Sequence, residues 1–200
     1  MPSTRANYIV ILVAVLLAGC ATPRAAKEQR TAPPRDQSIY EPDLPWFTDA
    51  GAPLKLSALA GEPCVLSFFF SVCSFKCPIT VENMRQVEAS LPREARQRVR
   101  FVLVTFDPES DTVDVLRRYR TAHRLNGENW ILLRGDAAAV RELARRTGYA
   151  FELHGGGGVR HDSLIMVLDS AGRPGFQHDG LYGGVNELQL AVRKMLAERP

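Results

Sequence analysis

Residues 64–78 read CVLSFFFSVCSFKCP and join a buried strand to the start of a helix. The apolar run 64–70 is typical of a central strand that is covered on both faces of its sheet. Pro78 suits the first turn of a helix because no backbone N–H is needed there. The apolar residues that follow at helical spacing are Val81, Met84, Val87 and Leu91. The stretch therefore predicts a strand, a loop and a helix, with two cysteines at the joint.

Strands and helices alternate in the rest of the chain. Further strands are predicted at residues 101–106, 130–133 and 164–168. Helices are predicted from about Asp111, after a cap at Asp136, and over residues 185–197. Upstream, the turn signal at residues 49–51 with Leu54, Leu56 and Leu59 fits a short hairpin. This alternation predicts an α/β fold, a three-layer sandwich with an N-terminal hairpin extension.

Composition excludes several classes of protein. The chain has 200 residues, a net charge of +3, 46% apolar residues and four cysteines. Such a chain is too apolar to be disordered, and its charge excess is too small for a polycation that binds nucleic acid. Four cysteines are too few for a disulfide-stapled small scaffold. One core-forming domain with additional segments is expected.

The N-terminus predicts export and attachment to a membrane. The apolar run 8–18 is too short to cross a bilayer core of about 30 Å, so residues 1–19 are interpreted as a signal peptide. Leu17-Ala18-Gly19-Cys20 resembles the lipobox of bacterial lipoproteins, which implies a lipid-modified Cys20. The alternative is an ordinary secretory signal with a chance cysteine. Residues 20–43 are expected to form a flexible tether, and residues 44–200 the domain.

Cys73 and Cys77 lie where a buried strand passes into a helix, a usual place for chemistry in an α/β sheet. If Cys77 begins the helix, the helix dipole should lower the pKa of its thiol. Two thiols at this spacing can close a disulfide or bind one metal ion, and both outcomes are open. The alternative is a pair of buried structural cysteines.

Four motifs in order resemble the Sco/SenC family. The stretch FFFSVCSFKCPITVENM looks like that family's C-x-x-x-C-P motif, and residues 104–112 match its D-P-x-x-D-T stretch. Residues 130–135 match its next strand, and residues 159–169 its histidine and following strand. The resemblance runs from about Leu44 to the C-terminus. It implies a thioredoxin-like fold with a central mixed sheet, and a copper protein that helps to assemble cytochrome c oxidase.

The resemblance assigns Cys73, Cys77 and His161 as copper ligands. Two thiolates and an imidazole form a soft site that prefers Cu(I), with Cu(II) also possible. Without the resemblance, His161 would more often be an ordinary surface residue. His154 precedes a run of four glycines and is interpreted as a solvated loop residue rather than a transient fourth ligand.

Two further residues carry open alternatives. Asp107 is interpreted either as a carboxylate that supports the site or docks a partner, or as a turn residue before Pro108. Cys64 is expected to pack as a small buried side chain rather than to bind metal.

The resemblance implies a membrane-tethered copper chaperone of the bacterial cell envelope that faces the periplasm. Its expected partners are cytochrome c oxidase subunit II, an upstream copper donor and a thiol reductant, without nucleic acid. A redox-active Cys73–Cys77 disulfide would support the alternative, a thiol-disulfide reductase, so enzymatic activity stays open. Against a general reductase, no proline occurs in residues 159–168, where thioredoxin-like reductases place one. A peroxidase of the peroxiredoxin kind is a weaker alternative, because its Pro and Thr pattern is missing before Cys73.

Overall fold

The computed structural model describes residues 37–154 and 158–198. The predicted signal peptide, Cys20 and most of the predicted tether lie outside the described residues. The described helices are all too short or too polar to span a bilayer.

The centre of the domain is a mixed sheet of seven strands in the order β2-β1-β5-β4-β3-β8-β9. Its three parallel strands are β3 (Cys64–Phe69), β4 (Arg100–Thr105) and β5 (Trp130–Gly135). The antiparallel strands are β1 (Trp46–Thr48), β2 (Pro53–Leu54), β8 (Leu164–Leu168) and β9 (Pro174–Asp179). The predicted central mixed sheet is therefore confirmed.

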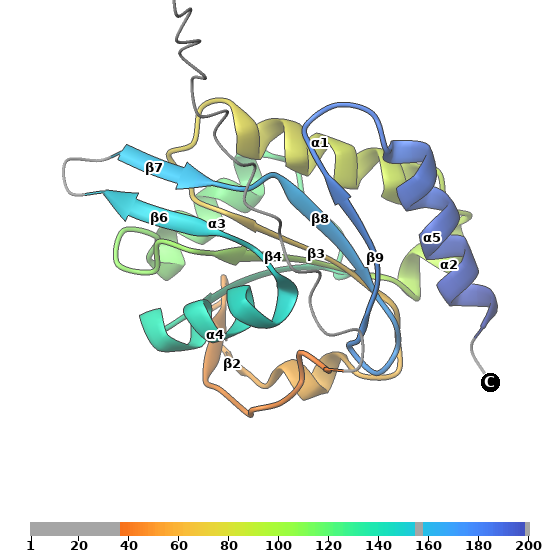
Figure 1. The fold of residues 1–200 in the computed structure, drawn as a ribbon, viewed down its shortest axis with the longest axis horizontal. Helices are drawn as coiled ribbons and strands as arrows, with labels where there is room; N and C mark the ends of the chain where they lie inside the picture. Colours follow the sequence, from red (N-terminus) through yellow and green to blue (C-terminus); the bar gives the residue numbers. More distant parts are fainter. Residues whose placement is uncertain (1–36, 155–157, 199–200) are drawn as a thin grey trace, which may run out of the picture. The chain divides into compact units, whose positions relative to one another are not determined.

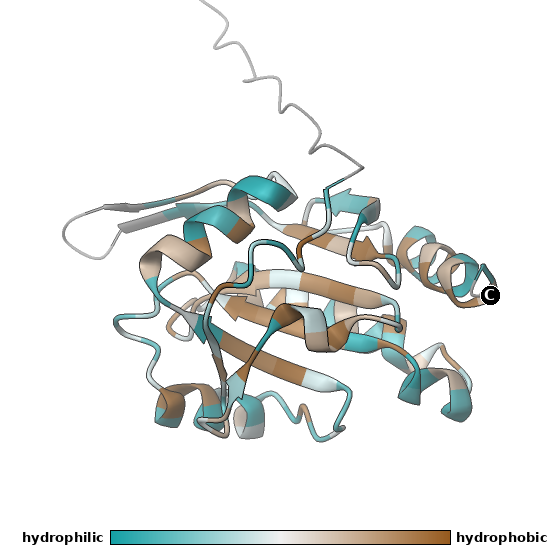
Figure 2. Ribbon diagram, turned by 90° about the horizontal axis from the view of Figure 1, so that it is seen from below, coloured by the Kyte–Doolittle hydropathy of each residue, from teal (hydrophilic) through white to brown (hydrophobic). Residues whose placement is uncertain are grey.

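Helices cover both faces of this sheet, as Figure 1 shows. The helices are α1 (Lys76–Ala89), α2 (Arg93–Gln97), α3 (Val113–Ala122), α4 (Ala137–Thr147) and α5 (Val185–Ala197). Val65 and Phe69 of β3 pack with α1, α3 and α5, whereas Leu66 and Phe68 pack with α4 on the other face. The central strands β3, β4 and β8 are buried on both faces along nearly their whole length, so the middle of the sheet is apolar, as Figure 2 shows.

The N-terminal segment differs from the prediction in two ways. The hairpin is present, but it pairs β1 with β2. Leu56 and Leu59 lie instead in a 3-10 helix, η1 (Leu56–Leu59), because their spacing of three matches the period of that helix. In addition, Ile39 and Tyr40 are buried in the core, and Ile39 N donates to Gly172 O. The packed chain thus begins ahead of Leu44.

The sheet brings distant segments to one end of the domain. Phe69 and Thr105 are register partners, so the loops that follow β3 and β4 leave the sheet side by side. β8 is antiparallel to β3, so the chain enters β8 at this same end. It arrives there from a two-stranded ribbon, β6 (Phe151–His154) and β7 (Gly158–His161). The end of β7 therefore lies near the cysteine loop.

Candidate metal centre

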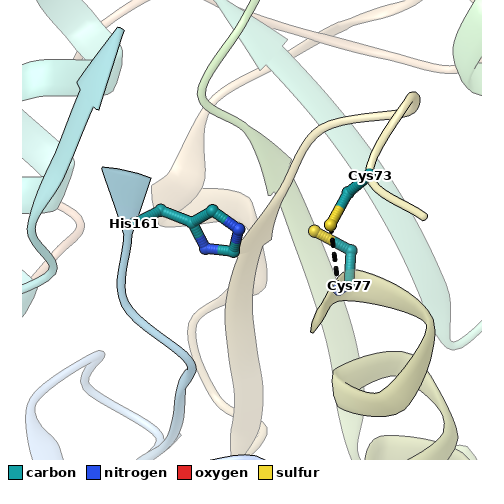
Figure 3. A group of neighbouring side chains, drawn as sticks. All are labelled: Cys73, Cys77 and His161. Carbon is teal, nitrogen blue, oxygen red and sulfur yellow. Dashed lines mark hydrogen bonds between the residues drawn. The ribbon is translucent and has the colours of Figure 1, made fainter. Parts of the chain in front are cut away.

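Three potential metal ligands converge at this end of the sheet. Cys73 comes from the loop after β3, Cys77 from the first turn of α1, and His161 from the last position of β7. One ligand atom from each side chain lies within 4.8 Å of the other two. Figure 3 shows the imidazole pointing toward the two sulfur atoms. The three residues predicted as ligands are thus brought together.

A tight turn sets the relation between the two cysteines. Cys73 N donates to Phe70 O over 3.2 Å, which closes a four-residue turn after β3. Cys77 N then donates to Cys73 Sγ over 3.3 Å, the hydrogen bond drawn in Figure 3. All described cysteines are free thiols. Cys77 is 1% exposed, whereas Cys73 is partly exposed, so an incoming group can reach the sulfur of Cys73 more easily.

The expected low pKa of Cys77 is wrong. Burial raises the pKa of this thiol, and the hydrogen bond with Phe70 only partly opposes that effect. Cys77 belongs to the apolar cluster that includes Val81 and Tyr119, so the thiolate would lose its hydration. This desolvation outweighs the helix dipole. In the metal-free protein Cys77 is therefore a neutral thiol.

The surroundings of His161 determine which ring nitrogen is free. His161 Nδ1 lies 2.5 Å from Asp162 O and 3.1 Å from Tyr149 Oη. A carbonyl oxygen can only accept, so this contact assigns the ring proton to Nδ1 and leaves the Nε2 lone pair for a metal.

The ring of His161 is also held by aromatic neighbours, Phe70 and Phe106, at centroid distances of 5.7 and 5.2 Å. Burial lowers the pKa of His161; the hydrogen bond with Asp162 O opposes this shift, and the charge of Lys76 adds to it. The net shift favours the neutral imidazole, the form that binds a metal ion.

Lys76 connects the cysteine helix to the histidine strand. Its Nζ donates to His161 O over 3.1 Å. This hydrogen bond spans from the first residue of α1 to the end of β7, so it restrains the elements that carry Cys77 and His161. Lys76 also brings a positive charge to a site whose two thiols become negatively charged thiolates when metal binds.

Asp111 lies buried next to the cysteine loop. It is 1% exposed, and both of its carboxylate oxygens accept from Ser71 N, over 3.2 and 3.3 Å. Thr105 Oγ1 donates to Asp111 Oδ2 over 2.5 Å. Burial raises the pKa of Asp111, and the hydrogen bonds from Ser71 and Thr105 oppose this shift.

The other predicted residues lie outside this group. Cys64 is fully buried at the start of β3, where burial raises the pKa of its thiol, so its expected packing role is confirmed. His154 ends β6 instead of lying in a loop. Asp107 accepts from Ser110 N and its own N–H donates to Thr105 Oγ1, which are contacts of a turn residue. Its role toward a metal stays a prediction.

Lys76, Asp111 and Tyr149 were not predicted at the site. Asp111 belongs to the D-P-x-x-D-T stretch, but an aspartate just before a helix looks like an ordinary cap. Lys76 lies between the cysteines, where a charged side chain is normally interpreted as solvated. Tyr149 directly follows Gly148, which ends α4, and only the folded chain brings it to His161.

Comparison of this chain with known proteins identifies the family to which it is similar. The family model described as SCO1/SenC matches residues 34–184. A protein of Stutzerimonas stutzeri, whose name provisionally describes it as copper-binding, is 29% identical over 143 residues. That alignment covers 70% of this chain and 68% of the relative.

Two solved structures share the fold. Bradyrhizobium japonicum ScoI with copper bound gives a TM-score of 0.63 at 18% identity, covering 77% of this chain and 96% of that one. A SCO1/SenC family lipoprotein of Bacillus anthracis gives 0.69 at 21% identity, covering 77% and 95%. The predicted thioredoxin-like sandwich is confirmed by these likenesses.

Proposed function

This chain belongs to the SCO1/SenC family, and we propose that it is a copper chaperone for cytochrome c oxidase. It binds one copper ion through Cys73, Cys77 and His161 and delivers it to the binuclear copper site of oxidase subunit II. The observation that carries the proposal is the group of two sulfurs and an imidazole within 4.8 Å at one end of the sheet. Copper reaches the chain from an upstream donor, and a thiol reductant keeps both cysteines reduced.

The donor set suits this cargo. Thiolates and imidazoles are ligands that copper prefers, and Cu(I) accepts a three-ligand site of this kind. Cys77 is the buried ligand, whereas Cys73 and His161 are both partly exposed, so Cys73 is the more accessible of the two sulfurs. Release can therefore proceed by ligand exchange that begins at Cys73, where a sulfur or nitrogen of the partner replaces its sulfur.

The N-terminal sequence supports a position at the membrane. We propose that residues 1–19 are a cleaved signal, that lipid on Cys20 holds the protein, and that the residues between Cys20 and the packed segment at Ile39 tether the domain on the periplasmic side. A lipoprotein of the same family from Bacillus anthracis shares the fold. A tethered domain would meet a membrane-bound oxidase at a raised effective concentration.

A copper transfer assay tests the proposal. The reduced protein loaded with one Cu(I) is mixed anaerobically with the metal-free, soluble copper domain of subunit II. After separation, copper should be found in the oxidase domain. As a control, the same amount of Cu(I) is added with the Cys73→Ser protein, which lacks one proposed ligand and therefore shows how much copper the acceptor takes up without the intact site. Copper that stays on the wild-type protein in the presence of excess acceptor would contradict delivery.

A second candidate function is a thiol-disulfide reductase that keeps oxidase cysteines reduced. The supporting observation is the contact between Cys77 N and Cys73 Sγ, which brings the two thiols to one turn. A modest shift would allow the S–S bond of about 2.05 Å. In this reaction Cys73 and Cys77 are oxidised to a disulfide while a client disulfide is reduced to two thiols. His161→Ala separates the candidates, because it should weaken copper binding and so reduce copper transfer, and should leave dithiol exchange unchanged.

A further inference from the structure

The turn that carries Cys73 is fixed by a buried carboxylate from another part of the chain. Ser71 is the second residue of this turn, and its N–H points away from the turn toward Asp111. Asp111 itself is fixed, because its N–H donates to Asp107 O over 2.9 Å and Thr105 Oγ1 donates to its Oδ2. The cysteine loop is thus tied to the end of β4.

Asp111 is not required by the helix that follows it. The N-cap of α3 is Thr112, whose side chain accepts from Val115 N. Both carboxylate oxygens of Asp111 point instead to Ser71. Burying a carboxylate is unfavourable unless hydrogen bonds compensate for its lost hydration. Here Ser71 N and Thr105 Oγ1 supply these hydrogen bonds, so the carboxylate holds both donors in place.

We propose that Asp111 is the positioning residue for Cys73. By accepting from Ser71 N, it fixes the turn that ends in the Cys73 N to Phe70 O hydrogen bond. This four-residue turn then holds Cys73 Sγ within hydrogen-bond distance of Cys77 N at the start of α1. The metal-free protein therefore already presents the two sulfurs together, and copper binding need not order the loop. This inference rests on the proposed role of Cys73 as a copper ligand.

Two substitutions separate the acceptor from the charge. Asp111→Ala removes every acceptor for Ser71 N, and copper affinity should fall about ten- to a hundred-fold, as it does when residues that orient metal ligands are lost. Asp111→Asn has nearly the same shape and keeps one oxygen for Ser71 N, so it should retain most of the affinity. If Asp111→Ala does not fold, Asp111→Ser replaces it, since its hydroxyl is too short to reach Ser71 N.

Thr147→Ala is the matched control. Thr147 is also fully buried, and its hydroxyl donates to Leu143 O within α4, on the side of the sheet opposite α1. It should lose stability without a change in copper affinity. Equilibrium unfolding of all variants identifies any general loss of structure.

The experiment combines anaerobic Cu(I) competition titration with amide hydrogen exchange of the reduced, metal-free protein. Expected results are a loss of both copper affinity and exchange protection at Ser71 and Cys73 in Asp111→Ala, and retention of both in Asp111→Asn. Wild-type affinity in Asp111→Ala, or an equal loss in both variants, would overturn the inference. If the wild-type protein takes up no copper, the proposed function fails, and hydrogen exchange alone then decides whether Asp111 holds the turn.

Discussion

Burial determines the charge state of two of the three ligand residues. Burial raises the pKa of Cys77 and lowers that of His161, so both side chains are neutral in the metal-free protein at neutral pH. His161 can therefore bind copper without losing a proton, whereas Cys77 must release one. Proton release at the site thus comes from sulfur rather than from the imidazole.

The first prediction follows from this difference. Between pH 6.5 and pH 8.5 the Cu(I) affinity should rise by at least about ten-fold per pH unit, because the Cys77 proton competes with copper across the whole range. The measurement is competition with a Cu(I) chelator of known pH dependence. An affinity that does not change with pH would show that Cys77 is already a thiolate.

Lys76 gives a second prediction at this scale. Lys76→Met should lower copper affinity by about ten-fold, because the hydrogen bond to His161 O and a compensating positive charge are both lost. Arg160→Met is the control, since Arg160 is an exposed basic residue of the same strand β7. Chelator competition measures both variants. Equal affinities for Lys76→Met and Arg160→Met would contradict a specific role of Lys76.

Among the elements, those with strong apolar patterns were predicted well. β8 and α5 have the predicted bounds, Leu164–Leu168 and Val185–Ala197. The ribbon of β6 and β7 and the edge strand β9 were missed, because glycines and polar residues obscure their alternation. These strands gain stability from pairing with a neighbour, which a local pattern does not reveal.

The start of α4 tests whether local capping and the metal site are independent. Asp136 Oδ1 accepts from Ala139 N over 2.7 Å, as the sequence predicted. Asp136→Ala should reduce the free energy of unfolding by about 1 kcal/mol, whereas Asp136→Ser, which keeps a capping oxygen, should be nearly as stable as the wild-type protein. Copper affinity should not change in either variant. Denaturant unfolding and copper titration check this, and a loss of affinity in Asp136→Ala would connect α4 to the site.

At the scale of the whole molecule, the sequence predicted the three proposed metal ligands but not the residues that hold them in place. The three ligands were found because their motifs follow one another in a familiar order. Asp111, Lys76 and Tyr149 were missed because their roles depend on burial and on contacts between distant segments. A sequence shows the type of a polar residue but not whether the fold excludes water from it.

Alkaline stability is a property of the whole folded chain. In the unfolded chain thiols ionise near pH 9.0, whereas burial keeps Cys64 and Cys77 protonated in the folded protein. The unfolded state then binds fewer protons, so stability is complete below pH 9 and falls as the pH rises. Between pH 9 and pH 10 each thiol should lower the free energy of unfolding by up to about 1.4 kcal/mol.

Urea unfolding of the reduced, metal-free protein at several pH values measures this loss. Cys64→Ala removes one of the two contributions, so its stability should fall less steeply with pH. A slope equal to that of the wild-type protein would show that Cys64 ionises normally in the folded state.

Anaerobic Cu(I) titration of the reduced protein tests most directly whether Cys73, Cys77 and His161 form one copper site. The wild-type protein should bind one copper ion, and Cys73→Ser, Cys77→Ser and His161→Ala should each weaken binding by about ten-fold or more. Wild-type affinity in His161→Ala, or copper binding that survives the loss of both cysteines, would contradict the site.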